Sequence, residues 1–113
     1  MPDELAGFGR FAEPSLAILI SLADGPRHGY AIMAAARELT GEPLGPGTLY
    51  ATLSRLEHRG LIEALPLEER RRPYRLTATG AGILRARLQG IESIASAGLA
   101  RLGRSEGSPS ATS

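Results

Sequence analysis

The chain has 113 residues and a mass of 11.9 kDa, which is enough for one domain with its own core. It contains no cysteine, so disulfide bonds, thiolate zinc sites and iron–sulfur clusters are excluded. Its 13 basic residues oppose 12 acidic residues, and the net charge of +1 does not by itself indicate a nucleic-acid ligand. All the basic residues are arginine, which fits either a biased base composition or a preference for bidentate phosphate contacts.

The N-terminal part of the chain predicts a short arm followed by two helices. Residues 1–13 are expected to form a flexible arm. Pro14 suits the first turn of a helix, and apolar residues then recur at helical spacing until the sequence Asp24-Gly25-Pro26 interrupts it. A second helix is expected to begin near His28 and to end at Thr40-Gly41, because its apolar residues follow one stripe.

A third helix is predicted from about Pro46 to Arg59. Leu49, Leu53 and Leu56 share one face of it and are expected in the core. The opposite face is small near its start, and its flanks carry polar side chains. These outward residues are Gly47, Thr48, Tyr50, Ala51, Ser54 and Arg55.

The periodicity then changes from that of a helix to that of strands. Residues 61–65 and 73–77 are short apolar or alternating segments, which predicts a β-hairpin. The polar turn between them holds three consecutive arginines, Arg70, Arg71 and Arg72. Four of the chain's arginines fall within residues 70–75, so the basic charge is concentrated on this hairpin.

The last helix is predicted to start near Thr77, and residues 78–104 are assigned to a C-terminal dimerisation helix. Its apolar residues alternate at spacings of four and three, which predicts a heptad seam. The seam consists of Leu84, Leu88, Ile91, Ala95, Gly98 and Leu102. The glycines of this helix fit either drift in an exposed helix or close approach of a second helix. Residues 105–113 are rich in serine and glycine and are expected to be disordered.

This order of elements predicts a mainly α fold with a small β-hairpin, namely a winged helix-turn-helix over residues 14–77 plus the C-terminal helix. In that geometry the third helix enters the major groove of DNA and the hairpin touches the neighbouring backbone. Small side chains on the third helix allow close approach to the bases, and arginines on the hairpin suit phosphate contacts.

Three motifs resemble those of the PadR family of bacterial transcriptional regulators. They are Gly25–Ile32 with the sequence GPRHGYAI, Pro46–Ile62 with PGTLY, RLE and GLI, and Arg72–Thr77 with RPYRLT. The likeness covers about residues 14–88, and the short last helix resembles the smaller PadR subfamily. The resemblance implies a cytoplasmic homodimer that binds a palindromic operator, mostly as a repressor, with its last helix as the main dimer contact.

The resemblance also implies that His28, Gly29, Tyr30, Gly47, Thr48 and Tyr50 lie at the DNA. The outward side chains of the third helix and of the hairpin complete the expected DNA-binding set with Ala51, Ser54, Arg55, Arg70, Arg71, Arg72 and Tyr74. Some members of the family release DNA when a phenolic acid or a planar drug binds, so a small aromatic effector is expected. The tryptophans that hold such a drug in some small members are absent, because this chain has no tryptophan.

Each functional interpretation has a structural alternative. Tyr30 and Tyr50 also suit half-buried core positions, and His28 also suits a helix start. The three arginines of the hairpin turn, Arg70, Arg71 and Arg72, which we call the wing arginines, also suit a solvated turn. A rival function is a ligand- or protein-binding winged helix with little DNA affinity, whose apolar pocket between subunits would be lined by Phe8, Phe11 and the last helix.

An enzyme is the weakest interpretation. The sequence offers no acid–base or nucleophile set. The two histidines have no further ligand cluster beside them, so no metal and no cofactor are expected.

Overall fold

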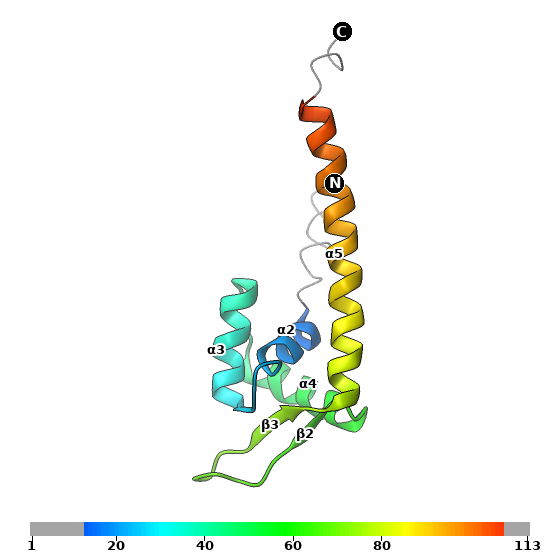
Figure 1. Ribbon diagram of the computed structural model, residues 1–113. Coiled ribbons are helices and arrows are strands. Elements are labelled where there is room, and N and C mark those ends of the chain that lie inside the picture. The colour runs from blue at the N-terminus through cyan, green and yellow to red at the C-terminus, as the bar shows by residue number, and fades with distance from the viewer. Residues whose placement is uncertain (1–12, 108–113) are drawn as a thin grey trace.

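The computed structural model describes residues 13–107, which form a small helical body with one long projecting helix (Figure 1). The predicted arm before Glu13, together with Phe8 and Phe11, lies outside the described residues, as do residues 108–113 of the predicted tail. The elements in chain order are α2 (Pro14–Ser21), β1 (Arg27–His28), α3 (Gly29–Thr40), α4 (Pro46–His58), β2 (Ile62–Ala64), β3 (Pro73–Leu76) and α5 (Ala78–Gly107).

The three short helices begin where the sequence predicts, and α3 and α4 also end there, whereas α2 ends at Ser21, before the predicted stop at Asp24-Gly25-Pro26. Proline occupies the first turn of both α2 and α4, where its missing N–H is not needed. Gly41 follows α3 with φ 75°, a left-handed conformation that glycine adopts without steric cost, and this ends the helix. These local signals explain why the helical spans could be read from the sequence.

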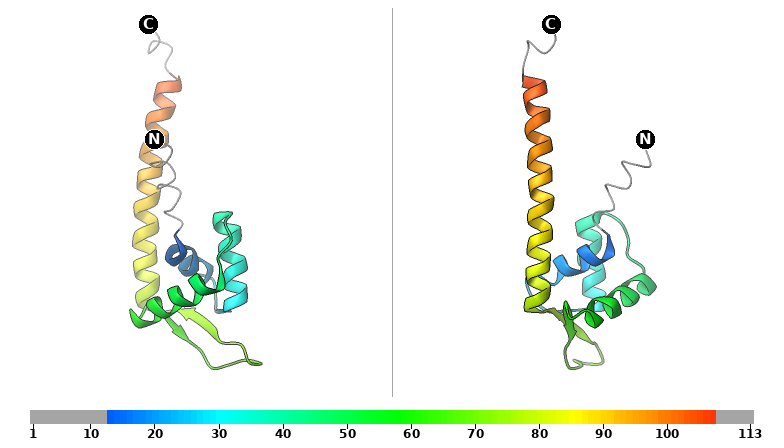
Figure 2. Two further views of the ribbon diagram at one scale, coloured as in Figure 1. Left: turned by 180° about the vertical axis from the view of Figure 1, so that it is seen from behind. Right: turned by 90° about the vertical axis from the view of Figure 1, so that its right-hand side faces the viewer.

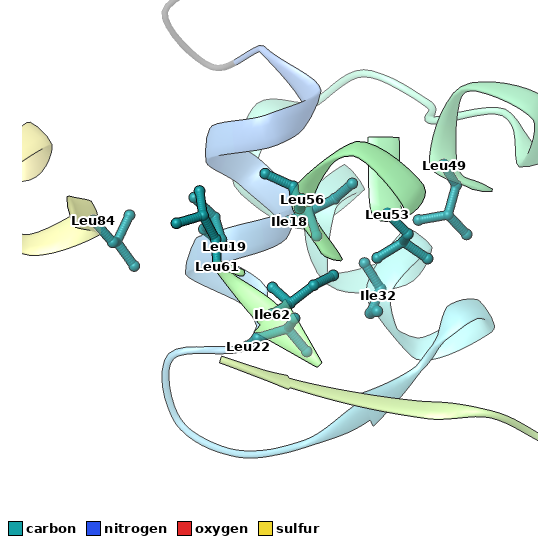
Figure 3. Close-up of a cluster of buried hydrophobic side chains, with 10 residues drawn as sticks. All are labelled: Ile18, Leu19, Leu22, Ile32, Leu49, Leu53, Leu56, Leu61, Ile62 and Leu84. Carbon is teal, nitrogen blue, oxygen red and sulfur yellow. The ribbon is translucent and has the colours of Figure 1, made fainter. Parts of the chain in front are cut away.

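One hydrophobic core joins the helical body. Figure 3 shows side chains from α2, α3, α4 and β2 pointing toward a common centre. Leu49, Leu53 and Leu56 of α4 are buried in it, which confirms the face predicted from their spacing. Ile18 and Ile32 meet them from α2 and α3. Because all three helices share this core, their relative orientation is fixed by packing.

The sheet contains the predicted hairpin and one strand that the sequence did not predict. β2 pairs antiparallel with β3, with Ala64 opposite Tyr74 and Ile62 opposite Leu76. β1 pairs with the other edge of β3, so that the strand order is β1-β3-β2. The strand β1 has only two residues, too few to show an alternating pattern. It directly precedes α3, and it therefore joins the helix-turn-helix to the hairpin.

The last helix is longer than predicted and leaves the body after its first turns. It has 30 residues, and at about 1.5 Å per residue it spans roughly 45 Å. The molecule measures 67 × 28 × 20 Å, and the views in Figure 2 show that α5 accounts for its long axis. Disorder was predicted from residue 105, but α5 continues to Gly107 because no proline interrupts it before that point.

One residue of the predicted dimer seam belongs to the core of the chain itself. Leu84 is only 4% exposed and packs in the cluster that contains Leu19 and Leu61 (Figure 3). Its assignment to the seam was therefore wrong, since its apolar surface is already covered. Heptad spacing identifies an apolar face but does not say which surface covers it.

The start of α5 is fixed on the backbone of Leu61. The Thr77 N–H donates to the Leu61 carbonyl oxygen at 3.0 Å, and the Thr77 hydroxyl accepts from the Gly80 N–H at 3.0 Å, which caps the helix. A Cβ atom built on Gly80 would lie 2.0 Å from the same Leu61 oxygen. The close approach that this glycine permits is therefore within the chain and does not involve a second helix.

Replacing Gly80 with alanine is expected to lower the free energy of unfolding by about 3 kcal/mol, because the added methyl group collides with a backbone oxygen that cannot move freely. Urea denaturation followed by circular dichroism measures this change. Gly82→Ala is the matched control: nothing lies within 4 Å of its added Cβ, so it should stabilise the helix by about 0.5–1 kcal/mol. Equal effects of the two substitutions would contradict this account of the junction.

Candidate nucleic-acid interface

The outward face of α4 is open and carries small or hydrogen-bonding side chains. Those predicted to face DNA are all exposed in the structure, and they are Gly47, Thr48, Tyr50, Ala51, Ser54 and Arg55. The first turn of α4 contains no acidic residue, so the partial positive charge of the helix N-terminus is not opposed there. The buried leucines on the other side hold this face in place.

Tyr50 links the start of α4 to the start of α3. A Cβ atom built on Gly29 would lie 2.6 Å from the Tyr50 hydroxyl oxygen and 3.4 Å from Leu49. Glycine at this position therefore leaves the space in which the tyrosine ring lies. Tyr50 is still 54% exposed and Tyr30 is 76% exposed, which contradicts the alternative that Tyr30 is a core residue.

The hairpin ends in a two-residue turn with strained backbone. The Glu68 and Arg71 backbones exchange two hydrogen bonds of 2.8 Å, and the two residues between them both have positive φ, 47° for Glu69 and 71° for Arg70. This is the geometry of a type I′ turn, in which asparagine and glycine are preferred. Residues other than glycine pay a steric cost in this region, so the turn presents its arginine at the expense of stability.

The wing arginines lie beside the start of α3 and enclose a cleft of about 440 Å³. Its lining residues come from β1, α3, α4 and the hairpin, and they are His28, Gly29, Tyr30, Tyr50, Leu67, Arg70, Arg71 and Arg72. The hairpin and the first turn of α3 lie at the same end of the molecule, opposite the free end of α5 (Figure 1). The fold thus brings together seven predicted residues from three separate segments, and Leu67 is the lining residue that the sequence analysis missed.

Two hydrogen bonds hold wing arginines in this arrangement. Arg71 Nη1 lies 3.2 Å from His28 Nε2, although the two residues are 43 positions apart. Arg72 Nη1 donates to the Leu65 carbonyl oxygen at 2.8 Å. Both guanidinium groups remain exposed, so each keeps donors that face solvent.

The base of the hairpin is stabilised by polar contacts, and its residues do not line the cleft. Arg75 Nε donates to Glu63 Oε1 at 2.8 Å, which forms an ion pair across β2 and β3. Tyr74 precedes Arg75 on β3, lies opposite Ala64 of β2 and is half-buried. Burial, followed by the negative charge of Glu57, raises the pKa of the Tyr74 phenol above its usual value of 10.0. The phenol therefore stays protonated at neutral pH and keeps its capacity to donate a hydrogen bond.

Other kinds of site have little support in the part of the chain that the structure covers. Within residues 13–107, no three His, Asp or Glu side chains gather in a way that would hold a metal ion. None of the helices in this range combines the length and the apolar character that a membrane-crossing segment needs.

Comparison with known proteins decides the family. The model of the transcriptional regulator PadR-like family matches residues 18–86, which span the second half of α2, all of α3, α4 and the sheet, and the first turns of α5. The chain belongs to this family. This is a family of transcriptional regulators and not of enzymes, and the winged-helix fold predicted from the sequence is confirmed.

Solved structures of transcriptional regulators agree with this assignment. A PadR family transcription regulator from Clostridium difficile is 29% identical, with a TM-score of 0.70, over 80% of this chain and 98% of that one. A transcriptional regulator from Clostridium thermocellum is also 29% identical, with a TM-score of 0.66, over 75% of this chain and 88% of the other.

A curated relative has a different length. A 37.1 kDa protein in transposon TN4556 of Streptomyces fradiae is 45% identical over 75 residues, which is 66% of this chain. The chain spans only 22% of the length of that protein.

Replacing Glu69 with asparagine, or Arg70 with glycine, is expected to raise the free energy of unfolding of this PadR-like protein by roughly 0.5–1 kcal/mol each. The reason is that asparagine and glycine tolerate the positive φ of these two positions better than the residues they replace. Chemical denaturation measures the change. Glu68→Asn is the matched control, because Glu68 does not have positive φ, and it should bring no gain. Stabilisation by the control alone would show that the turn is not the source of strain.

Proposed function

We propose that the protein is a transcriptional repressor that acts as a homodimer on a palindromic operator. The observation that carries this proposal is that the hairpin turn with its three arginines lies beside the first turn of α3, at the end of the molecule opposite the free end of α5 (Figure 1). Repression is proposed because most PadR regulators that the motifs resemble are repressors.

In this proposal α4 reads the bases and the wing contacts phosphates. The small exposed side chains of Gly47, Ala51 and Ser54 let the helix lie close to base edges in the major groove. Arg70, Arg71 and Arg72 supply exposed donors for the backbone beside it. Two such units would reach successive major grooves about 34–36 Å apart on one face of the duplex.

The uncovered apolar side chains of α5 support a homodimer. Large apolar residues along α5 are well exposed in the single chain, among them Leu88, Ile94, Leu99 and Leu102, the last at 59%. A row of such residues on one long helix is unfavourable in water and favours a partner helix. The proposed seam consists of Leu88, Ile91, Ala95, Gly98 and Leu102, without Leu84.

A small aromatic effector is part of the proposal. An open cleft of about 370 Å³ lies where α5 meets the body, with Ala23, Leu76, Leu84 and Leu88 as apolar lining. A planar apolar molecule there would touch both the body and the helix that joins the two subunits, and would thereby change the angle between the two winged helices. The rival, a ligand- or protein-binding winged helix with little DNA affinity, would instead use a pocket between subunits lined by the last helix and by Phe8 and Phe11, which lie outside the described residues.

Replacing Arg70, Arg71 and Arg72 together with alanine is expected to weaken binding to every duplex by at least about tenfold at physiological salt, because phosphate contacts carry no sequence information. The plot of log affinity against log salt should also flatten, by about 0.9 for each lost phosphate contact. Fluorescence anisotropy with promoter and random duplexes measures both quantities.

Arg104→Ala is the matched control for this experiment, because Arg104 is exposed near the far end of α5. It should leave affinity and salt dependence unchanged. An unaltered slope in the triple variant would exclude the wing from phosphate contact. If the unmodified protein shows no preference for its own promoter, and its affinities for DNA are weak and nearly independent of salt, the rival function is correct.

Replacing Leu88 with glutamate is expected to give monomers that no longer bind the operator, because a charge in the seam must be desolvated for the helices to pair. Light scattering coupled to size exclusion measures the mass. Leu102→Glu tests the same seam at a position far from the body, where the change does not threaten the core. Dimers that persist in both variants would refute the seam.

A further inference from the structure

His28 occupies a position from which it reaches both the helix-turn-helix and the wing. Its backbone lies in β1, opposite Pro73 of β3, and it is also the residue before the first turn of α3. Its side chain makes no capping hydrogen bond to that helix. The imidazole instead lies against the wing, with Nε2 at 3.2 Å from Arg71 Nη1.

The chemistry of this contact fixes the roles of the two groups. A guanidinium has five N–H donors and no acceptor, so the histidine must accept the hydrogen bond at Nε2. A hydrogen bond in this contact thus requires the tautomer that carries its proton on Nδ1 and leaves Nε2 as the acceptor. A neutral acceptor leaves the full positive charge of Arg71 available to a third partner.

We infer that His28 is a positioning residue that holds the Arg71 side chain in place for a DNA phosphate. This inference rests on the proposed function, and it gives His28 a role other than direct contact with DNA. The backbone of Arg71 is already fixed by its two 2.8 Å hydrogen bonds with Glu68, so the His28 contact adds the orientation of the side chain.

The physical benefit is a smaller loss of conformational freedom on binding. An unrestrained arginine side chain occupies many rotamers, and it loses this conformational entropy when it binds a phosphate. Arg71 is restrained before DNA arrives, by a residue that belongs to the helix-turn-helix rather than to the wing. Arg72 is restrained in a different way, through the Leu65 carbonyl oxygen of its own hairpin. Arg71 is thus the arginine whose placement depends on where the wing sits relative to α3.

The test compares two amides at position 28. Glutamine places its side-chain oxygen near the position of Nε2, whereas asparagine is too short to reach Arg71. Asparagine is also a favoured residue at a helix N-cap, so it does not weaken the start of α3. A purely structural role for His28 would make His28→Asn harmless, and the positioning role makes it costly.

Binding of full-length protein to its promoter duplex is measured against NaCl concentration at pH 8.5, for the unmodified chain, His28→Gln, His28→Asn, Arg71→Ala and the double variant His28→Asn/Arg71→Ala. We expect Arg71→Ala to lose about tenfold in affinity and to lower the salt slope by about 1.8 per dimer, that is, 0.9 for each of two phosphates. His28→Asn should lose about three- to tenfold and lower the slope by about 1, although it removes no charge.

The double variant decides between positioning and independent action. If His28 acts through Arg71, the double variant binds like Arg71→Ala alone, and His28→Gln stays within about twofold of the unmodified chain. The inference is overturned if His28→Asn leaves the slope unchanged, or if the losses of the two single variants multiply in the double variant. Melting temperatures of all variants separate loss of fold from loss of binding.

Failure of the wider proposal has a different signature. If Arg71→Ala leaves both affinity and slope unchanged, the wing does not contact phosphate, and the proposed function needs another DNA surface. If Arg71→Ala behaves as expected and His28→Asn does not, only the positioning role of His28 is lost.

Discussion

The carbonyl group of Leu61 is the point on which the rest of the structure depends. Its side chain is buried in the core, and its oxygen accepts from the Thr77 N–H where α5 begins. Gly80 passes over the same oxygen at a distance that no other residue tolerates. The helical body, the hairpin and the long helix therefore meet at one peptide group. Because peptide groups are rigid and planar, the direction in which α5 leaves the body is set there.

A second constraint connects the wing with the helices beside it. The two residues of β1 pair with β3, so the wing is bonded to the segment that leads into α3. Because Gly29 has no side chain, the Tyr50 ring packs against the start of α3, and this contact links the start of α4 to α3. The wing, α3 and α4 are held together through contacts among residues that adjoin the cleft. In the proposed complex such a surface would bind DNA as one body, which keeps the entropic cost of binding low.

The sequence predicts regular elements well and contacts between distant segments poorly. The spacing of Leu49, Leu53 and Leu56 predicted the buried face of α4, because a helix of three turns shows its period. β1 is too short to show one, and neither Glu69 nor Arg70 is a residue that normally indicates a type I′ turn. A family motif brought His28 into the predicted site, and the concentrated charge of the hairpin turn brought in the wing arginines. Their hydrogen bond spans 43 residues and could be found only from the fold.

The length of α5 has a mechanical consequence. The helix is about 45 Å long and is held by the body only at its first turns, so it works as a lever whose fulcrum is the Gly80 junction. A rotation of about 10° at the fulcrum would displace the far end by about 8 Å. The cleft beside Leu84 and Leu88 lies on the same arm as the far end of α5, but close to the fulcrum. A molecule that moves the helix slightly at that point would therefore shift a partner bound near Leu102 by several times as much.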